Sequence, residues 1–463
     1  MLEEIHLYYT NDLHSNFEHW PRVASFIKEA MADKKEKNES YWLVDIGDHV
    51  DRVSPIAEAY MGKANVALMN DLGYDIVTLG NNEGITLAHD DLYHLYEDAD
   101  FQVVCSNLKS MDRDNPEWLQ PIVQVQSIKG VKIGVLGLTA PFNAFYNLLN
   151  WHVDFPLDTL ERYVNELKES VDIIILLSHL GINEDRQIAD RFPQIDVIIG
   201  GHTHHLLKIG ETVNDTLITA AGKHCEYVGE ITLTWDHARK RLKNKEAQSL
   251  SVTELPKDLQ TEQALNELNV QADAIMSESI IHTDQMIEVS WFKQTKIMKE
   301  LTNTLRLWTG AECAMLNAGL LLEPFDQGNV TYKDVHRICP HPINPCLVTL
   351  KGDELLEVIR ASYSRELTEL KLKGFGFRGE VIGKMIFSGL DVDTDTHRNG
   401  QEFVKEVWFD GEPLNLERIY TLATADTFTF GRLLPEIAKS EMKSYFLPEL
   451  IRDLLVKTLK ESF

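Results

Sequence analysis

Five apolar runs in the first half of the chain each end in hydrophilic residues that can bind metal ions. The runs read IHLYYTNDLH, YWLVDIGDH, YDIVTLGNN, DIIILLSH and DVIIGGHTHH. Continuous Val, Ile and Leu runs are typical of strands buried on both faces, and ligands of open α/β sheets bind at the carboxyl ends of such strands. The pattern therefore predicts that seven side chains share one rim: Asp12, His14, Asp48, Asn81, His179, His202 and His204.

Segments between these runs carry apolar residues at helical spacing. Residues 55–72 and 159–169 show this spacing, and each segment precedes an apolar run, at 75–79 and 173–177. This alternation predicts a mixed sheet covered by helices on its faces. The run CEYVGEITLTWDH, at 225–237, is predicted to be an edge strand that closes the domain.

The composition changes after this run. The segment ARKRLKNKEAQSL is basic and polar, and 257–279 is acidic with helical spacing, which favours a helical connector. A helix at 290–308 then precedes short strands, turns and Gly-containing segments, which are typical of an α+β domain. Because 463 residues exceed what one core usually supports, we expect a catalytic domain at 1–245, a helical linker at 246–285 and a substrate-binding domain at 286–463.

Composition and charge narrow the possible partners. The net charge of -27 argues against duplex nucleic acid, so a phosphorylated substrate must be held locally by metal ions or a few basic groups. No stretch approaches the roughly 18 apolar residues of a membrane-spanning helix. The first residues lack the features of a signal peptide and the five scattered cysteines fit reduced thiols, so we expect a cytoplasmic protein, with a mature secreted form as the alternative. The oligomeric state stays open.

Two of the motifs place potential ligands two residues apart. Asp12 and His14 would project to one side if their strand ended in an extended conformation. His202 and His204 follow two glycines, Gly200 and Gly201, which permit close backbone approach. One such motif is weak evidence, since Asp at a strand end is commonly a turn residue. Seven oxygen and nitrogen ligands together are too many for one ion and suit two.

In this order, D-x-H, GD, GN, SHLG and GHTH resemble the block motifs of calcineurin-like metallophosphoesterases. In the second half, LNAGLLLEPFDQGNVTYKDVHRICPHP and ATADTF resemble stretches of the bacterial two-domain 5'-nucleotidases, and the YunD-like branch of that family looks closest. The resemblance covers nearly the whole chain. It implies an α/β fold with an N-terminal four-layer β-sandwich flanked by helices and a smaller C-terminal α+β domain. It also implies a phosphoric ester hydrolase acting on a small phosphorylated molecule, with a nucleotide as the leading expectation.

The resemblance further implies how the ligands divide between two divalent ions, with Mn²⁺ expected and Zn²⁺, Fe²⁺, Co²⁺ or Mg²⁺ as alternatives. The first ion would be held by Asp12, His14, Asp48 and His204, and the second by Asp48, Asn81, His179 and His202. Asp48 would bridge them, since a carboxylate can bind two cations. Ions about 3.5 to 4 Å apart can activate a bridging water for in-line attack on phosphorus.

The chain departs from the family beside Asn81. Most members read GNHEFD, in which the His assists the leaving group and the Asp orients it, whereas this chain reads GNNEGI. Asn82 and Ile85 therefore replace that pair. An amide can donate a hydrogen bond to a phosphoryl oxygen but cannot supply a proton, a contribution typically worth about 10²- to 10⁴-fold. His49 and His89 are candidate substitutes, although each also fits a structural role, which we expect for His205.

The family's base pocket is altered as well. After Asn317 and Gly319 the chain has three leucines where the family has an Arg, and Lys384 and Thr427 stand where stacking aromatics are expected. A shifted platform could use Phe375, Phe377 and Phe428, since any aromatic face can stack on a base. Each of the three also fits a core position. Arg378 could meet a phosphate, or it could be a solvated loop residue.

These departures leave three functions open. The leading hypothesis is a metal-dependent phosphoesterase of the 5'-nucleotidase type, with Asp48, Asn81 and Asn82 in the catalytic centre. The first alternative is a 2',3'-cyclic nucleotide phosphodiesterase or a nucleotide pyrophosphate hydrolase on the same metals. The second is a degenerate member that binds a metabolite or a protein partner and turns over little, which the loss of the His and Asp pair keeps open.

Overall fold

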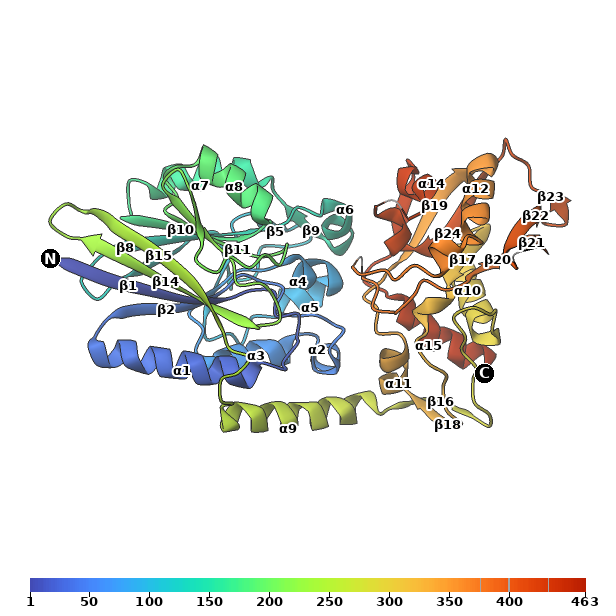
Figure 1. Ribbon diagram of the computed structural model, residues 1–463, viewed down its shortest axis with the longest axis horizontal. Coiled ribbons are helices and arrows are strands. Elements are labelled where there is room, and N and C mark those ends of the chain that lie inside the picture. Colours follow the sequence, from blue (N-terminus) through green and yellow to red (C-terminus); the bar gives the residue numbers. More distant parts are fainter. Residues whose placement is uncertain (375, 399, 432) are drawn as a thin grey trace. The chain divides into compact units, whose positions relative to one another are not determined.

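The computed structural model describes residues 1–374, 376–398, 400–431 and 433–463, which form two compact units (Figure 1). Unit 1 runs from Met1 to Ala272 and unit 2 from Asp273 to Phe463. Each unit has its own hydrophobic core. The expected two-domain α/β architecture is confirmed, whereas the domain limits drawn at residues 245 and 285 stay a prediction.

Unit 1 contains two sheets that pack face to face. Their strand orders are β15-β14-β1-β2-β3-β4-β6 and β12-β13-β11-β10-β8-β7. Ile5 and Val44 of the first sheet share one buried core with Ile175 and Ile199 of the second. The first sheet comprises β1 (Leu2–Thr10), β2 (Ser40–Asp45), β3 (Ile76–Val77), β4 (Gln102–Val104), β6 (Leu119–Gln120), β14 (Tyr227–Asp236) and β15 (Arg241–Ser251). The second comprises β7 (Val123–Gln126), β8 (Lys132–Thr139), β10 (Ile173–His179), β11 (Val197–Gly200), β12 (Glu211–Val213) and β13 (Thr216–Thr219).

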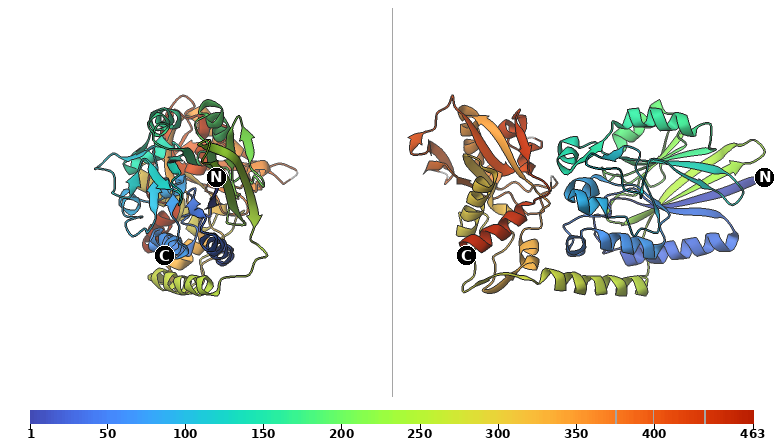
Figure 2. Two further views of the ribbon diagram at one scale, coloured as in Figure 1. Left: turned by 90° about the vertical axis from the view of Figure 1, so that its left-hand side faces the viewer. Right: turned by 180° about the vertical axis from the view of Figure 1, so that it is seen from behind.

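Helices cover both outer faces of this sandwich, which gives the four layers expected. On the second sheet, Leu160 of α7 and Ile188 of α8 pack against Leu176 and Ile198. On the first sheet, α1 and α3 lie along β1 and β2 (Figures 1 and 2). The predicted helix at 55–72 is divided into α2 and α3. The helices of unit 1 are α1 (Trp20–Lys37), α2 (Pro55–Tyr60), α3 (Lys63–Leu72), α4 (Asn81–Thr86), α5 (His89–Tyr93), α6 (Asn143–Tyr146), α7 (Pro156–Leu167) and α8 (Ile182–Arg191). A further helix, α9 (Leu259–Met276), begins in unit 1 and ends in unit 2. A short pair, β5 (Leu108–Ser110) and β9 (Trp151–Val153), lies beside them.

The prediction of an edge strand at 225–237 was wrong in one respect. The strand exists as β14, but it pairs with β1 on one side and with β15 on the other, so that β15 is the edge. The basic segment that forms β15 alternates exposed and half-buried residues. Lysines on an edge strand discourage pairing with other chains, and here they concealed the strand in the sequence.

Unit 2 is an α+β domain. Its main sheet, within the described residues, has the order β20-β17-β24-β19-β25, and α10, α12 and α15 contribute to its core. This sheet comprises β17 (Cys313–Asn317), β19 (Pro345–Lys351), β20 (Met385–Ser388), β24 (Ile419–Ala425) and β25 (Lys443–Tyr445). The remaining elements are β16 (Ser279–Thr283), β18 (Gly328–Thr331), β21 (Asp391–Thr396), β22 (Glu402–Phe409), β23 (Glu412–Pro413), α10 (Lys296–Thr309), α11 (Tyr332–Ile338), α12 (Gly352–Ser362), α13 (Arg365–Thr368), α14 (Pro435–Lys439) and α15 (Ile451–Ser462).

Two further expectations concern the whole chain. All five cysteines are buried and unpaired, as expected for reduced thiols. Across the described ranges, no helix combines the length and the apolar character needed to cross a lipid bilayer.

Candidate metal centre

All seven predicted ligands lie at the carboxyl ends of parallel strands in unit 1. Each sheet contributes part of the set, so the centre lies at the edge where the two sheets meet. The first sheet supplies Asp12, His14, Asp48 and Asn81, after β1, β2 and β3, and the second supplies His179, His202 and His204, at or after the ends of β10 and β11.

One group of ligand atoms comes from Asp12, His14 and His204. The Nε2 atom of His14 is 3.1 Å from Nε2 of His204 and 3.9 Å from Oδ1 of Asp12. The Nε2 atom of His204 is 3.5 Å from the same Asp12 oxygen. Because two imidazole nitrogens this close repel through their lone pairs unless a proton or cation lies between them, the group suits a cation.

A second group comes from Asp48, His179 and His202. Oδ1 of Asp48 is 3.3 Å from Nε2 of His179, and Oδ2 of Asp48 is 3.7 Å from Nε2 of His14. The two oxygens of one carboxylate thus face the two different groups. Asp48 can therefore contribute a ligand atom to an ion in each.

Two buried atoms at this centre have no hydrogen-bond partner in the described part of the chain. They are Oδ1 of Asn81 and Nε2 of His179. Nδ1 of His179 donates to the carbonyl oxygen of Ile46 at 2.7 Å, so Nε2 is the nitrogen whose lone pair becomes available to a metal ion when the ring is neutral. Leaving buried acceptors without a partner is costly. A divalent cation would satisfy both atoms, so the residues fit the metals that the fold implies.

The ionisation behaviour of the centre also favours positive charge. Burial would raise the pKa of Asp48, but His179 and His14 outweigh it and hold that pKa below its ordinary value. Burial likewise opposes a charged His179, yet Asp48 and Asp12 raise its pKa to about 10. The carboxylates thus draw a proton to the position where a cation would bind.

The backbone conformation of the ligands differs from the extended one considered from the sequence. The φ angles of Asp12, His14 and Asp48 are 51°, 50° and 50°, and those of His202 and His204 are 70° and 56°. Since β1 ends at Thr10, left-handed turns bring Asp12 and His14 together, and an extended strand end was the wrong expectation. A left-handed conformation costs a non-glycine residue about 1–3 kcal/mol and persists where the surroundings enforce it, commonly at functional sites.

Glu83 joins the two loops that carry Asp48 and Asn81. Its fully buried carboxylate accepts hydrogen bonds from the N–H groups of Asp48, Val50 and Gly80, at 3.1, 2.7 and 2.9 Å. Burial, followed by the charge of Asp48, raises the pKa of Glu83 to about 7. The loops touch so closely that a Cβ on Gly80 would lie 2.0 Å from Oδ1 of Asp48. Glu83 was not predicted from the sequence, although it stands inside the GNNEG motif.

Asn82 lies against the first ligand group. Its N–H donates to Oδ1 of Asp48 at 2.8 Å, and its Nδ2 is 2.9 Å from Nδ1 of His14. Two residues on, Gly84 stands where the family has Phe. A Cβ on Gly84 would lie 2.2 Å from the hydroxyl oxygen of Tyr146, so Tyr146 occupies that space.

The histidines considered as substitutes for the family's acid make structural contacts. His49 is buried with its ring centroid 5.4 Å from that of Trp20, and burial lowers its pKa to about 3. The ring of His89 lies 4.9 Å from that of Trp151, and its Nε2 is 3.2 Å from Oγ of Ser110. Exposed His205 has Nδ1 2.9 Å from Oγ1 of Thr203. Packing accounts for His49 and His89.

Asp51 is a second residue of the site that was not predicted from the sequence. Its buried carboxylate has Oδ2 3.3 Å from Nδ1 of His14, on the side of the ring away from the ligand group. Burial would lower the pKa of His14, but the contact with Asp51 and the charge of Asp48 raise it. A carboxylate behind a ligating imidazole fixes its tautomer and raises its basicity. In the sequence, Asp51 is indicated only by being an acidic residue three positions after Asp48.

We expect Asp51→Asn to weaken Mn²⁺ binding by about 10- to 100-fold, because Asn cannot supply the negative charge behind His14. The amide keeps an oxygen for the N–H of Val53, which now donates to Oδ1 of Asp51 at 3.0 Å. Calorimetric titration of the metal-free protein measures the change. Asp71→Asn, on the exposed side of α3, is the matched control. Equal affinities in the two variants would contradict a positioning role for Asp51.

In unit 2, the predicted substrate residues Asn317 and Gly319 connect neighbouring segments. Nδ2 of Asn317 donates to the carbonyl oxygen of Ile382 at 2.9 Å. A Cβ on Gly319 would lie 1.9 Å from the carbonyl oxygen of Val381. These local contacts account for the residue types at positions 317 and 319, and the contact of Asn317 and Gly319 with substrate stays a prediction.

The predicted aromatic platform of unit 2 is largely internal. Phe428 and Phe377 are 0% and 3% exposed, and Phe377 stacks on His341 with centroids 5.1 Å apart. Phe375 lies outside the described residues. Arg378 is exposed and its backbone N–H donates to Nδ1 of His341 at 2.9 Å. Phe377 and Phe428 thus pack in the core of unit 2, and their stacking on a base stays a prediction.

Two protein families match the chain, one for each unit. The calcineurin-like phosphoesterase family matches residues 5–206, and the 5'-nucleotidase C-terminal domain matches residues 272–432. Together with the ligand groups, these matches define a metal-dependent phosphoester hydrolase, and the chain belongs to the two-domain metallophosphoesterases. An uncharacterized metallophosphoesterase of Bacillus subtilis (strain 168), YunD, is 40% identical over 463 residues, which cover 100% of each chain.

Solved structures share the fold at lower identity. NAD nucleotidase from Haemophilus influenzae has a TM-score of 0.69 and 16% identity, covering 99% of this chain and 96% of its own. A 5'-nucleotidase precursor from Thermus thermophilus has a TM-score of 0.61 and 21% identity over the same shares. The expected family and fold are therefore confirmed.

Proposed function

We propose that the chain hydrolyses a phosphoester of a nucleotide at a centre of two divalent cations, with Mn²⁺ as the working metal. The observation that carries the proposal is the position of Asp48, whose two oxygens face the two ligand groups. A nucleotide is favoured because residues 272–432 match the 5'-nucleotidase C-terminal domain and two of the similar solved structures are named nucleotidases.

The ligand assignment proposed here follows the two groups. Cations bound there would neutralise phosphoryl charge and lower the pKa of the water that attacks phosphorus. Asn81 offers a neutral oxygen, which limits the negative charge of the second site. The first site would use the group of Asp12, His14 and His204 together with Asp48, and the second would use the group of Asp48, His179 and His202 together with Asn81.

Asn82 favours a second candidate reaction. Its amide can donate a hydrogen bond to a phosphoryl oxygen, but it cannot protonate a departing alkoxide. A phosphate leaving group needs less help from an acid than an alkoxide does. Hydrolysis of a nucleotide pyrophosphate on the same ligands is therefore the alternative that this residue supports.

A substrate screen with the full chain tests the proposal. Protein freed of metal and reloaded with Mn²⁺ is assayed with AMP, 2',3'-cyclic AMP, ADP and bis(p-nitrophenyl) phosphate. We expect phosphate release from AMP, and loss of all activity when a chelator removes the metal. Hydrolysis of the aryl diester alone would contradict a nucleotide substrate. If none of the compounds is hydrolysed by protein that holds its full complement of metal, the result would favour the hypothesis of a degenerate member that binds a ligand and turns over little.

A further inference from the structure

An apolar pocket of about 340 Å³ adjoins the metal centre within unit 1. Its walls come from the loop after β8, the start of α7 and one face of α8. This volume is in the range of pockets that bind small ligands. The side chains that shape it are Phe142, Phe155, Leu157, Leu180, Ile188 and His202.

The pocket is continuous with the ligand groups through His202. His202 belongs to the second group and also lines the pocket. The ring of Phe142 lies against it, with centroids 5.7 Å apart. A substrate whose phosphate contacts the second group can therefore extend its remaining part along Phe142 into the pocket.

The walls suit a flat, uncharged ring. Phe155 is 70% exposed and Phe142 is 39% exposed, and large apolar side chains that share an exposed patch commonly mark a binding site. Aromatic faces stack on any nucleobase. At the rim, Glu184 and Gln187 of α8 offer hydrogen-bonding groups, and the carboxylate of Glu184 would repel a second phosphate.

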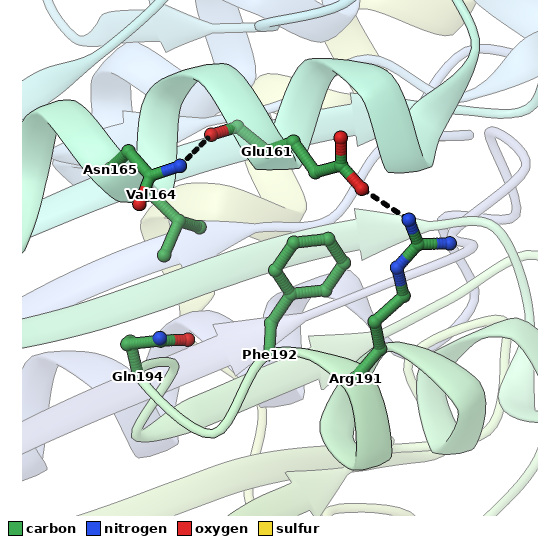
Figure 3. A pocket seen from close by; sticks show the side chains of 6 residues that line it. All are labelled: Glu161, Val164, Asn165, Arg191, Phe192 and Gln194. Atoms are coloured by element: carbon green, nitrogen blue, oxygen red, sulfur yellow. Dashed lines mark hydrogen bonds and ion pairs between the residues drawn. The ribbon is translucent and has the colours of Figure 1, made fainter.

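In unit 2, the described aromatic residues that were predicted to contact a base are less accessible. Phe377 and Phe428 of unit 2 are buried, and Leu320 follows Gly319 where the family has an Arg. A second pocket in unit 1, of about 230 Å³ between α7 and α8, is lined partly by Arg191 and Glu161, whose side chains form an ion pair (Figure 3). That pocket includes no predicted ligand of the metals.

We infer that the pocket beside His202 binds the nucleobase of the substrate, with Phe142 and Phe155 as its aromatic contacts. The inference rests on the proposed function, because it takes the substrate to be a nucleotide. It assigns base recognition to unit 1, next to the reacting phosphate.

Binding of adenosine to the Mn²⁺-loaded full chain tests the inference by calorimetry. Adenosine has no phosphate, so its binding does not depend on hydrolysis, and the outcome is separate from that of the substrate screen. We expect Phe142→Ala to raise the Kd of adenosine about tenfold or more, as loss of a stacking ring does. Phe142→Tyr, which keeps the aromatic face, should restore the native Kd.

Two further variants complete the test. Phe155→Ala should also raise the Kd, and because Phe155 is exposed its removal leaves the core of unit 1 intact. Ile128→Ala is the control, since Ile128 is 57% exposed in the turn between β7 and β8, at the opposite end of β8 from the centre. Absence of adenosine binding, or a Kd unchanged in both Phe→Ala variants, would overturn the inference.

Discussion

Replacing Asp48 by Ala is expected to lower the hydrolysis of bis(p-nitrophenyl) phosphate about a thousandfold or more. Its two oxygens face both ligand groups, so under the proposed ligand assignment the substitution would remove a ligand from each metal site. Metal ions supply several kcal/mol of transition-state stabilisation, and each 1.4 kcal/mol or so is a factor of ten in rate. The value of kcat/KM, measured together with the metal content of the variant, quantifies the loss.

Two features of this experiment distinguish a loss of catalysis from a loss of folding. The N–H of Asp48 that donates to Glu83 belongs to the backbone and is retained in Asp48→Ala. Asp71→Ala removes the same charge from the exposed side of α3 and should keep native activity. Substantial hydrolysis by Asp48→Ala, with thermal unfolding matching that of the control, would show that Asp48 does not bridge two ions.

The second large effect is a gain. We expect Asn82→His to raise kcat for AMP about a hundredfold, the lower end of what a general acid contributes. Asn82 lies beside two of the proposed ligands, since its N–H donates to Oδ1 of Asp48 at 2.8 Å and its Nδ2 is 2.9 Å from Nδ1 of His14. An imidazole at this position can protonate the alkoxide that leaves AMP. The kcat values for AMP and for p-nitrophenyl phosphate measure the effect, because the aryl leaving group needs no proton.

A general acid has two further signatures. The gain should fall at high pH as the new imidazole loses its proton, and Ile85→Asp in the same chain should extend the gain to higher pH by stabilising the imidazolium. Asn82→Gln keeps the amide and serves as the control. An equal change for both leaving groups would indicate altered metal binding and would argue against proton transfer.

The sequence predicted that the proposed metal ligands would meet at one edge of the sheets, for a physical reason. Parallel strands end at one edge, so Asp12, Asp48 and His179 could be grouped from their place after apolar runs. The sequence did not predict the left-handed backbone at Asp12 or Asp48, because neighbouring loops enforce that conformation.

Contacts between distant loops were also invisible in the sequence. Asp51 acts on His14, which is 37 positions away, and Glu83 binds the N–H of Asp48, which is 35 positions away. Burial of Phe428 likewise depends on how unit 2 packs. The sequence places an aromatic there but does not say which way its ring faces.

Because Tyr146 fills the space beside Gly84, substitutions at positions 84 and 146 can occur in one order only. Any side chain at position 84 would collide with the Tyr146 hydroxyl, at 2.2 Å for the first carbon alone. A smaller residue at position 146 must therefore come before a larger one at position 84. A proton donor at position 82 could therefore return to the loop while position 84 stays glycine.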